Sequence, residues 1–76
     1  MNSTMIQDKS TGNTFWVTSY HKDGSWGVLG ASTAGAGKID TTHNLLTKFT
    51  YMDGGKIDLN QLKKAVDFHS GENQGN

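Results

Sequence analysis

Residues 14–30 read TFWVTSYHKDGSWGVLG, and this stretch decides the fold. Two runs rich in aromatic and β-branched residues, 14–21 and 26–30, flank Lys22-Asp23-Gly24-Ser25. Such runs favour strands, and Asp-Gly between them is a strong hairpin signal because Gly adopts positive φ and Asp accepts it better than most residues. The stretch therefore predicts an antiparallel hairpin over about 14–30.

Alternation along this hairpin distributes its apolar side chains over two faces. With a two-residue turn, we expect Trp16 and Tyr20 to share one face with Leu29. The other face then carries the remaining large apolar side chains: Phe15, Val17, Trp26 and Val28. Both faces are partly apolar, and a single helix can cover only one of them.

Residues 59–69 predict an amphipathic C-terminal helix, because its apolar side chains recur at helical spacing. Asp58 is a suitable N-cap, and Gln61 completes a D-x-x-Q start related to the capping box. Gly71 stands where a helix stop is expected. The residues of the apolar stripe are Leu59, Leu62, Val66 and His69.

The segment from 40 to 52 supports two interpretations. Leu45, Phe49 and Met52 have helical spacing, whereas residues 47–51 alternate and favour a strand. We expect a strand over about 45–52. The helical alternative rests on a short internal repeat, here called the sequence echo: the residues GKID at 37–40 recur at 55–58. If the echo is structural, Asp40 caps a second short helix and the strand is wrong.

The whole pattern predicts an α+β fold with a small antiparallel sheet of three to four strands and one C-terminal helix. A further short strand is expected near Met5–Gln7, and Gly30–Gly37 is expected to be a small-residue loop. The 76 residues make one domain over 1–71, followed by a flexible tail over 72–76.

Composition narrows the function classes. The chain has no Cys, which excludes disulfides, thiol catalysis and zinc ribbons. Its net charge is zero and all seven basic residues are Lys; without Arg, nucleic-acid binding is disfavoured. No apolar run approaches the roughly 18 residues of a transmembrane helix, and the first residues lack a signal-peptide pattern. A cytoplasmic location is expected.

No residue pattern indicates catalysis. Residues 32–39 resemble a phosphate loop, but Ser32 replaces its first Gly and Ile39 replaces its hydroxyl. A flexible linker is therefore expected, with an anion-binding nest as the alternative. The three His, at 21, 43 and 69, match no metal-ligand spacing. Since no acid–base carboxylate pair or nucleophile elbow is present either, we expect no enzyme, no metal and no cofactor.

The hairpin element, strand, Lys-Asp-Gly-Ser-Trp, strand, resembles part of the three-stranded sheets of several small domains, including the AP2-like arms of integrases. The resemblance covers less than a third of the chain. The absence of Arg argues against carrying DNA binding over, and no functional residue is transferred.

The aromatic cluster is the most informative functional feature, because four of the seven aromatic residues lie within residues 15–26. Trp and Tyr are favoured at protein interfaces. We expect a non-catalytic protein-binding module, with self-association as one form of that binding. Its size suits a phage or mobile-element accessory protein that inhibits a partner by occupying its surface. Its partner-binding residues would be Trp16, Tyr20, Trp26 and Leu29. The alternative is a small nucleic-acid-binding module using Lys22, Lys38 and Lys48 beside the hairpin aromatics.

Overall fold

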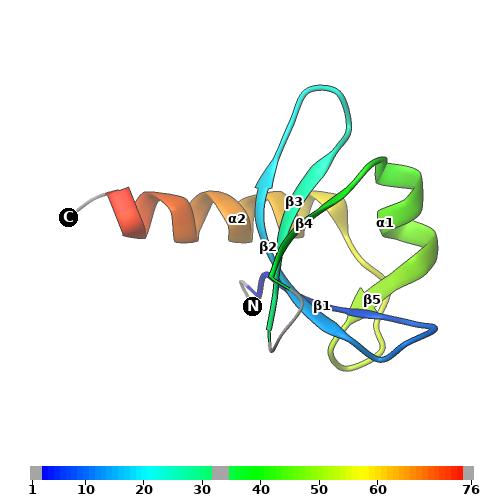
Figure 1. Ribbon diagram of the computed structural model, residues 1–76. Helices are drawn as coiled ribbons and strands as arrows, with labels where there is room; N and C mark the ends of the chain where they lie inside the picture. The colour runs from blue at the N-terminus through cyan, green and yellow to red at the C-terminus, as the bar shows by residue number, and fades with distance from the viewer. Residues whose placement is uncertain (1–2, 32–34, 75–76) are drawn as a thin grey trace.

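The computed structural model describes residues 3–31 and 35–74, with side chains described as far as His69 (Figure 1). These residues form a five-stranded antiparallel sheet in the order β4-β3-β2-β1-β5, together with two helices. The elements in chain order are β1 (Met5–Asp8), β2 (Thr14–Tyr20), β3 (Trp26–Gly30), β4 (Ala36–Ile39), α1 (Thr42–Lys48), β5 (Phe49–Tyr51) and α2 (Leu59–Gln74). The α+β class is confirmed, but the sheet has more strands than the predicted three to four and a second helix is present.

The two helices occupy different positions on the sheet. Helix α2 contacts β2, and its buried side chains belong to the core that one face of the sheet lines. Helix α1 contacts both β4 and β5, which are the two edges of the sheet. In Figure 1, α1 lies at the side of the strands and α2 crosses behind them. Because one short helix touches both edges, the sheet must curl around the core.

The core lies on the face of the sheet that we call the inner face. Trp26 is its largest fully buried side chain, with 1% of its surface exposed. The sheet and both helices contribute to it, as does the segment before α2. Its apolar residues are Ile6, Val17, Trp26, Val28, Ile39, Leu45, Ile57, Leu62, Ala65 and Val66.

The predicted hairpin is confirmed, and its turn is longer than expected. The Gly24 amide donates to the His21 carbonyl, and the His21 amide donates to the Ser25 carbonyl, both at 3.0 Å. Gly24 has a φ of 90°, which only Gly adopts easily. The two-residue turn is therefore wrong: residues 22–24 form a three-residue loop with Gly in the left-handed position.

The helix predicted over 59–69 is also confirmed at its start. The Asp58 carboxylate accepts from the Gln61 amide at 3.0 Å, as the N-cap assignment requires. Leu62 and Val66 are buried, whereas His69 is exposed. The predicted stop at Gly71 is wrong, because α2 continues to Gln74. One Gly costs a helix only about 1 kcal/mol, which its neighbours can offset.

The strand predicted over 45–52 is wrong in its first half. Residues 42–48 are helical, and β5 starts only at Phe49. The helix expected from the sequence echo exists, but its N-cap is Thr41, whose hydroxyl accepts from the Asn44 amide at 3.0 Å. Strand β4 was also missed, since it lies partly inside the predicted Gly30–Gly37 loop. Three of its four residues, Ala36, Gly37 and Lys38, have weak strand propensity, and the segment becomes a strand by pairing with β3.

Candidate functional site

The outer face of the sheet carries an apolar row that crosses four strands. Leu29 of β3 is paired with Ala36 of β4 and with Trp16 of β2, and Trp16 is paired with Met5 of β1. Directly opposed residues of neighbouring strands point to the same face. We call these four residues, Met5, Trp16, Leu29 and Ala36, the outer stripe.

The outer stripe is open to solvent at its centre. Trp16 is 42% exposed and Leu29 is 41% exposed. The buried residues of α1 and α2 lie in the core on the inner face, so within the described residues the helices do not bury the centre of this stripe. On one side it is flanked by the paired residues Thr14, Gln7 and Thr50, and on the other by Lys38.

The structure divides the four predicted partner-binding residues into two pairs. Trp16 and Leu29 share the outer face, as expected. Trp26 is buried in the core and is not available to a partner. Tyr20 was expected beside Trp16, but it pairs with Trp26 instead. The reason is an irregularity in the pairing of β2 with β3 between Val17 and Ser19, which shifts the alternation by one residue.

Tyr20 therefore belongs to a cluster at the end of the inner face. Its ring lies 5.7 Å from that of Trp26, and its hydroxyl donates to the Asp67 carboxylate of α2 at 2.8 Å. This hydrogen bond raises the pKa of Tyr20 above its usual value. The Lys63 ammonium lies 5.4 Å from the centre of the same ring, within cation–π range. The cluster joins the hairpin to α2.

A hollow of about 490 Å³ opens beside this cluster. We call it the basic hollow. Its walls come from the hairpin, from the first turn of α1 and from α2. The side chains that matter for its chemistry are Tyr20, His21, Lys22, Trp26, Thr42 and Lys63.

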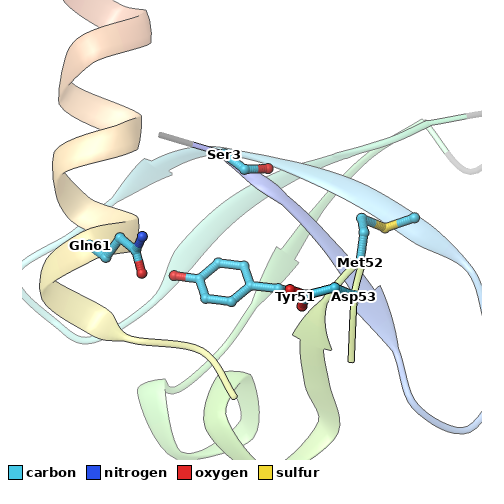
Figure 2. Close-up of a pocket in the computed structure, with 5 residues that line it drawn as sticks. All are labelled: Ser3, Tyr51, Met52, Asp53 and Gln61. Carbon is cyan, nitrogen blue, oxygen red and sulfur yellow. The ribbon is translucent and has the colours of Figure 1, made fainter. Parts of the chain in front are cut away.

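A second hollow, of about 290 Å³, lies where β5 ends and α2 begins. Figure 2 shows the Tyr51 hydroxyl pointing toward Gln61, with Ser3 and Met52 on another side of the space. The Tyr51 hydroxyl also donates to the Asp58 carbonyl at 3.2 Å, which fixes the start of α2 against the sheet. Ser3 directly follows residues that the structure does not describe, so this hollow supports no ligand assignment.

Charged side chains at the turns have local structural roles. Hydrogen bonds from Ser10 hold the pKa of Asp8 below its usual value, and hydrogen bonds from Ser25 do the same for Asp23. Within the described ranges, no three His, Asp or Glu side chains gather as a metal site would require. The proposed anion nest at residues 32–39 lies partly outside the described residues.

The sequence patterns did not single out several side chains of these surfaces, among them Met5, Ala36 and Lys63. Met5 and Ala36 join the outer stripe only through strand register, which no local pattern reveals. Lys63 lies in the only pair of adjacent lysines in the sequence, but its contact with the Tyr20 ring depends on how α2 crosses the sheet.

Neither α1 nor α2 combines the length and apolar character needed to cross a membrane. No protein-family model, curated protein or solved structure matches this chain, so its function has to be argued from these surfaces.

Proposed function

We propose that the protein is a non-catalytic binding module that contacts a protein partner through the outer stripe. The observation that carries the proposal is the unbroken apolar row across four strands, with Trp16 and Leu29 exposed at its centre. Exposed apolar residues are common when scattered, but a contiguous row bordered by polar residues is typical of an interaction surface.

The chemistry of the stripe suits a protein interface. Trp is among the residues that most often dominate binding energy, and a surrounding ring of weaker contacts excludes water from it. Here Leu29 and Met5 flank Trp16 on neighbouring strands, and hydroxyl and amide side chains form the border. The sheet also holds the row in place before binding, so little ordering is needed. A protein of this size would then act by occupying the partner's surface.

The nucleic-acid alternative has less support. Trp26 is buried and cannot stack on a base. The lysines named for this alternative lie on three different elements: Lys22 in the hairpin loop, Lys38 on β4 and Lys48 at the end of α1. Trp16 with Lys38 remains the part of the surface on which such binding would depend. Nuclease treatment therefore belongs in the test.

Site-specific photocrosslinking in the native cell tests the proposal. A photoreactive phenylalanine analogue replaces Trp16 in one variant and Phe68 in the other. Phe68 is a matched control, because it is aromatic, lies on α2 and is 53% exposed. We expect a discrete protein adduct from position 16 that survives nuclease, and none of that mass from position 68. Equal adducts from both positions, or an adduct lost on nuclease treatment, contradict a protein partner at the stripe.

Once the crosslinked partner is identified, its affinity can be measured for two variants at leucines of nearly equal exposure. Leu29 and Leu46 are 41% and 42% exposed, but only Leu29 lies on the outer stripe. Leu29→Ala should weaken the partner's affinity, whereas Leu46→Ala should leave it unchanged. Trp16→Ala should cost about 2 kcal/mol of binding if Trp16 is the centre of the interface.

A further inference from the structure

The basic hollow differs from the outer stripe in both shape and charge. It is concave, and its volume of about 490 Å³ is that of a small-molecule pocket. Three chain segments far apart in the sequence meet around it: Lys22 lies in the hairpin loop, Thr42 begins α1 and Lys63 lies on α2. A space of this form accommodates a small molecule better than the flat surface of a folded protein.

The charged groups of the hollow are unbalanced. Lys22 and Lys63 both line it, and no carboxylate of the described residues does. Within residues 3–31 and 35–69, neither lysine forms an ion pair. Two carboxylates are bonded to residues beside or in the hollow and keep their negative charge: Asp23 accepts from the Ser25 hydroxyl at 2.6 Å, and Asp67 accepts from the Tyr20 hydroxyl at 2.8 Å. Because the two ammonium groups line the hollow and these two carboxylates do not, the field inside it favours an anion.

Hydrogen bonds fix the floor of the hollow. The indole nitrogen of Trp26 donates to the Thr42 hydroxyl at 3.1 Å, and that hydroxyl donates to the Gly24 carbonyl at the same distance. This chain ties the hairpin loop to the first turn of α1. Because Trp26 is itself fully buried, the wall it provides cannot move without disturbing the core. A ligand would meet a preformed site, which lowers the entropic cost of binding.

We propose that the basic hollow binds a small phosphate-bearing molecule, with the ammonium groups of Lys22 and Lys63 contacting the phosphate. A phosphate dianion matches two lysine charges, and lysine binds phosphate as a point charge without the bidentate geometry of Arg. A nucleic acid would need further basic residues along a continuous path. Lys38 and Lys48 do not line the hollow. Asp67 limits the affinity, because its negative charge lies beside the Tyr20 wall.

Titration of the full chain, followed by amide chemical shifts, tests this site. The probes are inorganic phosphate and pyrophosphate, each compared with chloride at equal ionic strength. We expect saturable shifts at the amides of Lys22, Gly24 and Lys63. Lys22→Gln and Lys63→Gln should each weaken the affinity by about tenfold, as loss of a charged hydrogen bond does. Asp67→Asn should strengthen it, because the repelling carboxylate is gone.

Lys64→Gln is the matched control, since Lys64 is an exposed lysine next to Lys63 that does not line the hollow. It should leave the affinity unchanged, and circular dichroism should show that every variant is folded. The two lysines of the site lie on different elements, so failure of one variant to fold leaves the other as the test. Shifts spread over all lysines, absence of saturable binding, or equal losses in Lys64→Gln would overturn the proposal. So would binding of a single-stranded oligonucleotide without binding of either phosphate probe.

Discussion

The two tryptophans of the hairpin lie on adjacent strands and have opposite environments. Trp26 is 1% exposed and fills the core on the inner face, whereas Trp16 is 42% exposed on the outer face. Both belong to the same aromatic run, and neither has a neighbouring residue that marks it as core or surface. The difference shows that the apolar residues predict burial of one face of this hairpin, but that the placement of the helices decides which face becomes the core.

The inner face should respond to substitution far more strongly than the outer face. Trp26→Ala removes the largest buried side chain and the donor to Thr42. We expect a loss of about 3–5 kcal/mol, which leaves a domain of this size unfolded or nearly so. Urea unfolding followed by circular dichroism measures the loss. A fully folded variant with unchanged stability would mean that the inner face is not the core.

Helix α2 should matter almost as much, because it is the cover that makes the inner face a core. Leu62 is completely buried, and Leu62→Ala should destabilise the protein by about 2–5 kcal/mol. Leu46→Ala on α1 serves as the exposed control. If the two variants have the same unfolding midpoint, α2 does not pack on the inner face and the contrast between the two tryptophans has another cause.

Trp16→Ala should leave the monomer folded. Its cross-strand contacts with Leu29 and Met5 together stabilise the sheet by about 1 kcal/mol, so the cost should be several-fold below that of Trp26→Ala. Acrylamide quenching of single-tryptophan variants gives a second measurement, since Trp16 fluorescence should be quenched and Trp26 fluorescence protected. Equal quenching of both would remove the distinction.

Tyr20 lies at the end of the inner face, and its substitution should show the smallest effect, visible only at alkaline pH. Its hydrogen bond to Asp67 raises the pKa of Tyr20 above the usual 10.0, so folding favours the protonated hydroxyl. This contribution is fully present below about pH 10 and is lost as the pH rises through the folded pKa. The free energy of unfolding should therefore decline less steeply above about pH 10 in Tyr20→Phe than in the wild type.

Tyr51 is the control for this pH profile, because burial raises its pKa as well. Tyr51→Phe should remove its own part of the alkaline decline and leave that of Tyr20. A Tyr20→Phe variant whose stability falls with pH as steeply as the wild type would show that the bond to Asp67 is not formed in solution.

Much of the architecture was predictable where the signal was local. The positive φ at Gly24 and the cap at Asp58 each depend on a few neighbouring residues, and both are confirmed, although the hairpin loop is one residue longer than predicted. The prediction for residues 45–52 failed because each signal held over only part of its range: α1 ends before Phe49 and Met52 of the helical spacing, and the alternation over 47–51 forms a strand only from Phe49. The chain follows each in turn, and a window that averages them loses the boundary between α1 and β5.

The candidate site was predictable only in part. Trp16 and Leu29 were assigned to one face correctly because two errors offset each other: the loop over residues 22–24 is one residue longer than predicted, and the irregularity between Val17 and Ser19 shifts the alternation back. Tyr20 was assigned to the wrong face, because the irregularity between Val17 and Ser19 reverses the alternation of the last residues of β2 relative to Trp16. Nothing in the residues 17–19 indicates that irregularity.

The sequence by itself determined the hairpin, the start of α2, the absence of cysteine chemistry and the presence of more apolar surface than one helix can cover. These follow from turn chemistry, capping, composition and periodicity, which depend on near neighbours. Only the tertiary structure decided that Ala36–Ile39 is a strand, that Trp26 is core while Trp16 is surface, and that Lys22 and Lys63 share a hollow. Each of these depends on pairing or packing between segments distant in the chain, whose free energy no local pattern contains.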